Sequence, residues 1–158
     1  MDAIGSDAAV PLHYTEYDTR VAAYAVIVED GRILLTWFNG GPGRATPCWS
    51  LPGGGVEFDE SVEDAIVREA YEESGYRVEL IGPLATHSFA RAALPGGRPF
   101  RSLRILYRAR IVGGTLGVVE VGGTTDKAEW FELSAMPDEP LADVVVVGLD
   151  AWRRLPRD

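Results

Sequence analysis

The stretch GGVEFDESVEDAIVREAYEESGY, residues 54–76, decides the fold, because it carries the clearest helix signal in the chain. The signal predicts a helix over 61–74. Ser61 can cap its first turn, with Asp64 three residues later in the capping-box position, and Gly75 is a natural stop. The segments on both sides have strand-like patterns, so we expect an α/β fold.

The face of this helix that must point at the core is apolar in its first half and acidic in its second. On a helical wheel at about 100° per residue, three carboxylates continue the apolar stripe or lie at its edge: Glu69, Glu72 and Glu73. Like charges on one helix face repel, and partial burial raises the cost. A hard divalent cation such as Mg²⁺ would relieve it, since Mg²⁺ prefers carboxylate and carbonyl oxygens. The alternative is a solvated acidic face that binds nothing.

The segment LPGGG at 51–55 strengthens the metal interpretation. Glycines let the backbone approach a ligand closely and offer its carbonyl oxygens as ligands. A glycine loop, a capped helix and three carboxylates within twenty-five residues therefore predict a compact metal and phosphate site.

Strand-like segments account for most of the remaining chain. VAAYAVIVE at 21–29 and RILLTW at 32–37 predict a hairpin whose turn is Asp30-Gly31. The tail at 141–155 fits a strand or a helix, and Arg153 and Arg154 near its end favour a closing helix. Further strand segments are predicted near Cys48, at 77–90, at 103–112 and around Trp130-Phe131, with a loop at 93–99.

Length, charge and cysteine content limit the classes of function. The 158 residues fit one domain, which we place at 19–158 after a loose N-terminal arm at 1–18. A net charge of −9 argues against a nucleic-acid polymer as partner. The single cysteine, Cys48, excludes an internal disulfide and a cysteine-built metal site, and we expect it to be a small core residue. The N-terminal sequence lacks a basic segment followed by an apolar run, and no stretch approaches the ~20 apolar residues of a membrane span, so we expect a cytoplasmic protein.

The stretch from 54 to 76 resembles the Nudix box, G-x5-E-x7-R-E-U-x-E-E-x-G-U, in which U is an apolar residue. Ala70 and Tyr76 occupy the U positions, and Asp59 departs from the glycine that many members carry. The resemblance covers residues 20 to 137 and implies a single-domain Nudix-type α/β/α sandwich around a mixed β-sheet. Every fixed position of the box agrees: Gly54, Glu60, Arg68, Glu69, Glu72, Glu73 and Gly75.

By this resemblance the chain hydrolyses a nucleoside diphosphate linked to another moiety, such as a nucleotide sugar, an ADP-ribose-like compound or a (d)NTP. The family's metal ions, Mg²⁺ or Mn²⁺, would be held by Glu69, Glu72, Glu73 and the carbonyl of Gly53. Arg68 would orient the carboxylates, and Glu60 would support them from outside. The implied partner is therefore a small molecule.

The general base is open at this point. Within the family it is either a glutamate of the box or an acidic residue on a later loop. Inside the box the candidate is Glu72; outside it, Glu120, Asp126 and Glu129 are candidates. We place Asp126 with Arg68, Glu72 and Glu73 in the catalytic set, because glycines and hydroxyls surround it as in a mobile loop near a phosphate site. A polar turn before a strand is the alternative.

Basic and aromatic residues away from the box are candidates for substrate binding. Arginines around the 93–99 loop could meet phosphates, and an aromatic ring could stack on a base. The alternative is that they are surface charges and core aromatics. We select Arg91, Arg101, Arg104 and Trp37, and keep Arg98, Phe89 and Tyr107 as further candidates.

Two other functions are compatible with a Nudix-like core. An isopentenyl-diphosphate isomerase needs a cysteine in an upstream motif, and Cys48 lies in no such context. A non-catalytic binding or regulatory module usually lacks some of the glutamates, whereas none is lost here. We therefore favour the hydrolase. The exact substrate and the oligomeric state stay open, although family members are often homodimers.

Overall fold

Two β-sheets form the middle of the molecule in the computed structural model, which describes residues 9–43 and 45–157. The first sheet is mixed, with the order β5-β1-β7-β6, and β1 runs parallel to β7. In the second sheet β3 pairs antiparallel with β2, β4 and β8. The strands are β1 (Asp18–Val26), β2 (Val28–Glu29), β3 (Arg32–Phe38), β4 (Cys48–Ser50), β5 (Gly53–Gly55), β6 (Tyr76–Arg91), β7 (Phe100–Gly114) and β8 (Thr125–Glu132).

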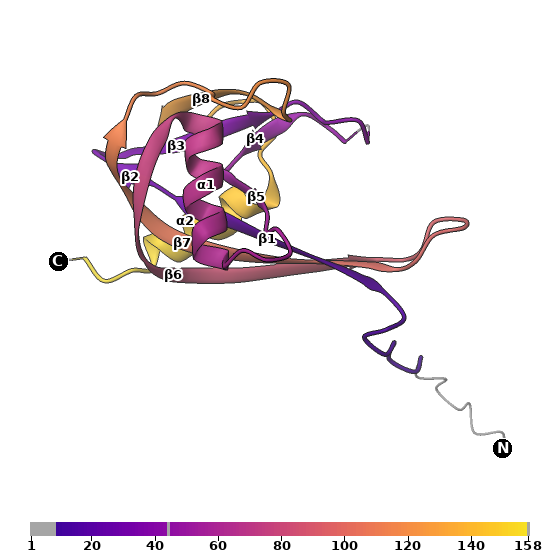
Figure 1. Cartoon of the computed structure of the whole chain (residues 1–158). Helices are drawn as coiled ribbons and strands as arrows, with labels where there is room; N and C mark the ends of the chain where they lie inside the picture. The colour runs from indigo at the N-terminus through magenta and orange to yellow at the C-terminus, as the bar shows by residue number, and fades with distance from the viewer. Residues whose placement is uncertain (1–8, 44, 158) are drawn as a thin grey trace, which may run out of the picture.

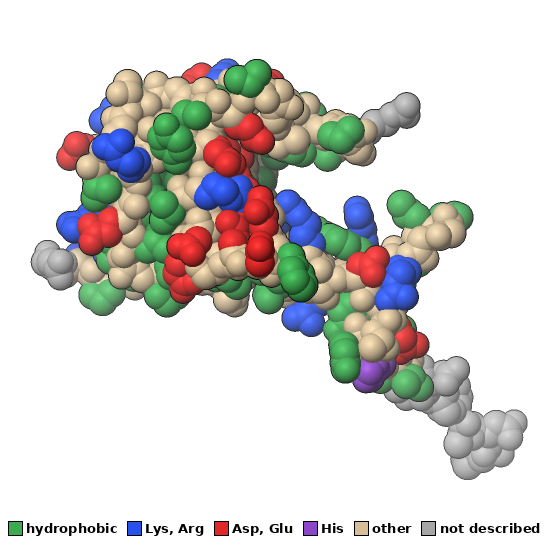
Figure 2. All heavy atoms as spheres, in the orientation of Figure 1, with side chains coloured by type: hydrophobic (Ala, Val, Ile, Leu, Met, Phe, Trp, Pro, Cys, Tyr) green, Lys and Arg blue, Asp and Glu red, His purple; other side chains and the backbone are tan. Residues whose placement is uncertain are grey.

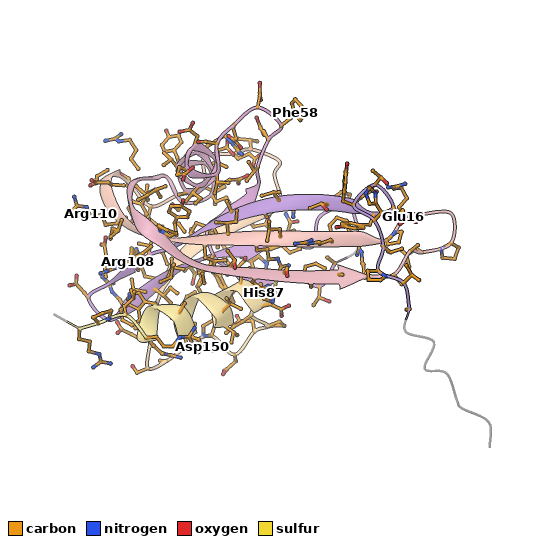
Figure 3. The ribbon with its side chains drawn as sticks, turned by 90° about the horizontal axis from the view of Figure 1, so that it is seen from below. Glu16, Phe58, His87, Arg108, Arg110 and Asp150 are labelled. Carbon is orange, nitrogen blue, oxygen red and sulfur yellow. The ribbon has the colours of Figure 1, made fainter. Side chains whose placement is uncertain are left out.

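The helices α1 (Val62–Ser74) and α2 (Asp143–Arg153) cover opposite faces of the mixed sheet, as Figures 1 and 3 show. Alternate side chains of β1 point to opposite faces, and both sets are buried. Ala23 of β1 packs in the cluster that contains Ile66 of α1, whereas Val26 packs in the cluster that contains Val145 of α2. This arrangement confirms the α/β sandwich around a mixed sheet that the sequence predicts.

The predicted strand at 21–29 is two strands in the structure. β1 ends at Val26, and the two residues of β2 pair with β3 in the other sheet. The predicted hairpin turn is confirmed, because Asp30 and Gly31 both have positive φ values, 49° and 74°.

Both predicted helices are confirmed. The hydroxyl of Ser61 accepts a hydrogen bond from the backbone N–H of Asp64 at 3.0 Å, and Gly75 ends α1 in the left-handed conformation with φ 75°. The tail forms a helix, α2, rather than a strand. No helix in the described ranges has both the length and the apolar character needed to cross a membrane.

The outer ends of β6 and β7 and the start of β1 project from the body as a three-stranded extension, which we call the hairpin arm (Figure 1). The loop 92–99 closes its tip, and the described residues 9–17 form coil and turn next to it. Arg98 fastens the two together, donating to Asp18 Oδ1 at 2.9 Å and to the carbonyl of Thr15. Residues 1–8 of the predicted N-terminal arm lie outside the described part of the chain.

Candidate active site

A cleft of about 620 Å³ opens beside the second half of α1. Figure 2 shows acidic side chains gathered next to the hollow between the hairpin arm and the loop after β3. One wall of the cleft, which we call the acidic wall, comes from α1 and the glycine loop, which forms strand β5. A second wall comes from β1 and β7, which follow β5 in the mixed sheet. Its charged lining residues are Arg20, Glu57, Arg68, Glu69, Glu72, Glu73, Arg104 and Glu120.

The glycine loop lies so close to its neighbours that side chains do not fit. A Cβ atom on Gly53, whose φ is 153°, would collide with the carbonyl oxygen of Ala23 on β1. A Cβ atom on Gly54 would lie 2.7 Å from Oε1 of Glu69. The glycines therefore let the loop backbone and the carboxylates of α1 come into direct contact.

Glu73 is the most buried of the glutamates, with 7% of its surface exposed. Its carboxylate accepts hydrogen bonds from the Gly53 N–H at 3.0 Å, from the Thr125 hydroxyl at 2.8 Å and from the Thr36 hydroxyl at 3.4 Å. Burial raises the pKa of Glu73 to about 8, although these donors act in the opposite direction. A charged Glu73 is therefore costly to bury unless a cation lies close to it.

Arg68 bridges three glutamates. Its Nε and Nη2 atoms bind both oxygens of Glu60, at 3.1 and 2.6 Å, and Nη2 also donates to the carbonyl of Gly55. Its Nη1 atom donates to Glu69 at 3.0 Å and to Glu72 at 3.1 Å. The hydrogen bond from Arg68 is the main reason that the pKa of Glu60 falls to about 2. Glu60 therefore fixes the Nε and Nη2 edge of Arg68, while Nη1 is shared between Glu69 and Glu72.

Glu69 and Glu72 differ in how much solvent they reach. Burial raises the pKa of Glu69, against the attraction of Arg68. The side chain of Glu69 is 14% exposed, and that of Glu72 is 32% exposed. The more accessible Glu72 lies at the open side of the acidic wall.

The loop between β7 and β8 brings a further carboxylate to the cleft. The backbone N–H groups of Val119 and Glu120 both donate to the carbonyl of Glu72, at 2.8 and 3.0 Å. These bonds tie the loop to the C-terminal end of α1, and Glu120 lines the cleft as a result. Glu120 is one of the three base candidates outside the box.

The carboxylate and carbonyl oxygens in the cleft are of the kind that binds a hard divalent cation. In the present structure these oxygens are bonded to other groups and do not surround a common point. Within the described ranges, no three His, Cys, Asp or Glu side chains are arranged to hold a metal ion. The reason is that Arg68 Nη1 occupies Glu69 and Glu72, while hydroxyl and amide donors occupy Glu73. Glu60 and Gly55 would still hold Arg68 if Nη1 released its two glutamates. To bind a cation, the carboxylates of Glu69 and Glu72 would turn away from Nη1, while the arginine stays bound to Glu60 and Gly55.

The other base candidates lie elsewhere. Asp126 is exposed, does not line the cleft and accepts a hydrogen bond from the Asn39 side chain at 2.8 Å. Glu129 pairs with Lys127 at 3.3 Å on the surface of β8. The structure thus places Glu120, and neither Asp126 nor Glu129, in the lining of the cleft.

Of the predicted substrate-binding residues, the structure brings only Arg104 to the cleft. Arg91 and Arg101 line an apolar groove at the outer end of the hairpin arm, and Arg91 lies over the Phe100 ring at 4.7 Å. Trp37 packs edge-on against Trp49, with ring centroids 5.2 Å apart, and does not line the cleft. Arg91, Arg101 and Trp37 therefore lie outside the cleft that Arg104 lines.

Several lining residues escaped the sequence interpretation. Thr36 and Thr125 are buried on the paired strands β3 and β8, and the hydroxyls of both donate to Glu73. A lone threonine inside the apolar run RILLTW was the one available signal for Thr36. Arg20 gave none, because it precedes the first apolar strand as an ordinary charged residue. Cys48, expected in the core, is half-buried and lines the cleft.

Comparison with known proteins gives a family match over most of the chain. The family model described as the NUDIX domain matches residues 17–146. An ADP-ribose pyrophosphatase from Methanocaldococcus jannaschii is 32% identical over 117 residues, which are 74% of this chain and 64% of that protein. An RNA pyrophosphohydrolase from Shewanella piezotolerans is 34% identical, over 66% of this chain and 54% of its own length. The chain thus spans between half and two thirds of these two relatives.

Solved structures share the fold. The MutT NUDIX hydrolase from Burkholderia pseudomallei aligns with a TM-score of 0.70 and 34% identity, covering 85% of this chain and 98% of that one. An ADP-ribose pyrophosphatase from Streptococcus suis aligns with a TM-score of 0.60 and 25% identity, covering 88% and 96%.

Proposed function

The chain belongs to the Nudix family, and on that premise we propose that it is a metal-dependent pyrophosphohydrolase. It cleaves a diphosphate bond in a nucleoside diphosphate linked to another moiety, and it uses Mg²⁺ or Mn²⁺. A cytoplasmic location and a homodimer are further predictions from the sequence.

The observation that carries this proposal is the contact between the glycine loop and the glutamates of α1. Glu73 accepts from the Gly53 N–H while Glu69 lies against Gly54, so backbone and carboxylate oxygens face one cleft. An anionic substrate would be repelled by this wall unless a cation were bound there. The same group of carboxylates therefore indicates both a bound metal ion and a phosphate-containing substrate.

The proposed metal ligands are Glu69, Glu72, Glu73 and the carbonyl of Gly53. A divalent cation bound there neutralises the phosphate oxygens and activates the attacking water. Arg68 holds the glutamates in place when the cation is absent and keeps its bonds to Glu60 and Gly55 when it is present. Thr36 and Thr125 fix the orientation of Glu73.

We assign the general base to Glu120 in preference to Asp126. Glu120 lines the cleft and its backbone is bonded to α1, whereas the Asp126 carboxylate is held by Asn39 outside the cleft. A base must come within hydrogen-bond reach of the water that it deprotonates, directly or through one further water. Glu72 is the alternative inside the box.

A substrate screen tests the proposal. Purified protein is incubated with dNTPs, nucleotide sugars, ADP-ribose, NADH, dinucleoside polyphosphates or coenzyme A, each with Mg²⁺, Mn²⁺ or EDTA. Released phosphate and nucleotide are then measured. We expect cleavage of at least one class that disappears in EDTA. If no compound is cleaved with either metal, the proposal is wrong and a non-catalytic binding module becomes the better explanation.

A further inference from the structure

Two arginines line the wall of the cleft that β1 and β7 form. Arg20 is on β1 and Arg104 is on β7, and these strands are parallel neighbours. Arg104 lies opposite Ala22, two residues after Arg20, so both arginines project from the same face of the sheet. Neither has an ion-pair partner within the described ranges, whereas Arg68, the third arginine of the lining, pairs with three glutamates.

The side chain of Arg104 is held by an aromatic ring, but one of its hydrogen-bond donors is unpaired. Its guanidinium lies over the Phe89 ring at 4.6 Å, and Phe89 packs against Phe100 with ring centroids 6.3 Å apart. Its Nη1 atom is buried and has no hydrogen-bond partner among residues 9–43 and 45–157. Burying a charged donor without an acceptor is costly, so this donor points to a ligand atom that accepts from it.

Arg20 lies between Arg104 and the glycine loop. A Cβ atom on Gly55 would be 3.3 Å from Arg20 Nη2, so the guanidinium rests against the backbone whose carbonyl Arg68 holds. Moving away from α1, the cleft therefore presents the glutamates, Gly55 with Arg20, and then Arg104. An anion bound at the glutamates could continue past Gly55 to both guanidiniums.

We propose that Arg20 and Arg104 form a second anion subsite, which receives the phosphate groups beyond the diphosphate held at the glutamates. The preferred substrates are then linear chains of three or more phosphates, as in nucleoside triphosphates, rather than diphosphates that end in an uncharged sugar. This assignment of substrate class rests on the proposed pyrophosphohydrolase function.

The chemistry of the two arginines supports this choice. Guanidinium groups bind phosphate through paired, charge-assisted hydrogen bonds. The protein carries a net charge of −9, so a polyphosphate needs local positive charge to stay in the cleft. An uncharged sugar would leave the buried donor of Arg104 without a strong acceptor, and sites built to bind a polar group discriminate against ligands that lack it.

Equilibrium binding of inorganic tripolyphosphate, measured by calorimetry at low salt with Mg²⁺ present, tests the subsite independently of nucleotide turnover. We expect the wild-type protein to bind tripolyphosphate more tightly than pyrophosphate. Arg104→Gln and Arg20→Gln should each weaken tripolyphosphate binding by about tenfold or more. Arg108→Gln is the matched control, because Arg108 is four residues along β7 from Arg104 and does not line the cleft (Figure 3). Equal binding of tripolyphosphate by wild type and both cleft variants would overturn the proposal.

Turnover with Mg²⁺ gives the second readout. The wild-type kcat/KM should favour a nucleoside triphosphate over a nucleotide sugar, and Arg104→Gln should reduce that preference by about tenfold. A variant that loses both activities equally would contradict the specificity role. If the wild type cleaves neither substrate yet binds tripolyphosphate through the two arginines, the pyrophosphohydrolase assignment fails while the subsite stands.

Folding is controlled separately, because Arg104 is half-buried and its replacement could disturb the sheet. Thermal unfolding of each variant identifies such damage. Arg20 is exposed, so Arg20→Gln tests the subsite even if Arg104→Gln does not fold. Arg104→Lys adds a further check, since it keeps the charge but should recover only part of the tripolyphosphate affinity.

Discussion

The two walls of the cleft are built in different ways. The acidic wall comes from residues 53–73, a single continuous stretch in which a glycine loop leads into a capped helix. The second wall, which we call the arginine wall, combines Arg20 on β1 with Arg104 on β7. These residues are far apart in the sequence and come together through strand pairing. The residues of the acidic wall are neighbours in the sequence, although Thr36 and Thr125 also hold Glu73, whereas the arginine wall is brought together by sheet register alone.

This difference suggests a division of roles between the walls. Glycine conformation, helix capping and the bonds of Arg68 hold the acidic wall, so its chemistry can stay constant while other parts of the chain vary. The arginine wall lies where the hairpin arm leaves the body, and changes in strand length or register would alter it directly. We therefore expect the reaction type to be set by the first wall and the substrate by the second.

The largest expected effect is that of Glu73→Gln on turnover. The substitution removes a proposed metal ligand but keeps a side chain of similar size among Gly53, Thr36 and Thr125. We expect kcat/KM at saturating Mg²⁺ to fall by about a thousandfold or more, because activation of water and charge neutralisation are both impaired. Steady-state kinetics with the substrate found in the screen measures it.

The metal-free stability of the same variant provides its control. Burial raises the pKa of Glu73. At pH values above the usual pKa of a glutamate, this carboxyl group therefore lowers the stability of the folded state, whereas a neutral amide does not. Glu73→Gln should therefore unfold in EDTA at the same or a higher temperature than the wild type. A variant with near wild-type turnover would remove Glu73 from the metal site.

The next largest effect separates two candidate bases. Glu120→Gln should lower kcat by about a hundredfold, the usual minimum contribution of a general base. Asp126→Asn should lower it by less than about tenfold, because Asp126 is bonded to Asn39 outside the cleft. The pH dependence of kcat for each variant identifies the group that is lost. The reverse order of effects would return the role to Asp126, and two small effects would return it to Glu72.

The acidic wall could be predicted from the sequence because its information is local. Capping at Ser61, the stop at Gly75 and the shared face of three glutamates each depend on residues within one helix. The glycine loop lies close to that helix in the sequence, so its presence beside Glu69 was predictable, whereas its pairing with β1 was not. The first hairpin was predictable for the same reason, since Asp30-Gly31 alone specifies its turn.

The arginine wall could not be predicted because sequence spacing does not give sheet register. Arg91, Arg101 and Arg104 are equally plausible in the sequence, yet only Arg104 projects into the cleft. β6 contains register shifts near Leu80 and Pro83, and each shift changes which residues of β7 oppose which residues of β6. The change of sheet after Val26 was hidden as well, because the apolar run continues through it.

A smaller effect tests how the acidic wall is held together. Glu60→Gln removes the anionic partner of Arg68 Nε and Nη2, so the guanidinium should compete more strongly for Glu69 and Glu72. We expect the Mg²⁺ concentration for half-maximal rate to rise about tenfold, with kcat at saturating Mg²⁺ little changed. Glu63→Gln is the matched control three residues later, in the first turn of α1, where Glu63 bonds to Tyr107 away from the cleft. An unchanged Mg²⁺ requirement would show that Glu60 does not position Arg68.

The smallest expected effect concerns the start of α1. Ser61→Ala removes the hydroxyl that caps the helix at Asp64 and should lower the free energy of unfolding by about 1 kcal/mol, measured by chemical denaturation. Ser134→Ala, in an exposed turn, is the control and should change it by less than about 0.5 kcal/mol. Turnover and Mg²⁺ requirement should stay at wild-type values, because Gly53 and Arg68 hold the glutamates more than one turn beyond the cap. If activity instead fell with stability, the acidic wall would depend on the whole helix rather than on its local contacts, and the contrast between the two walls would be lost.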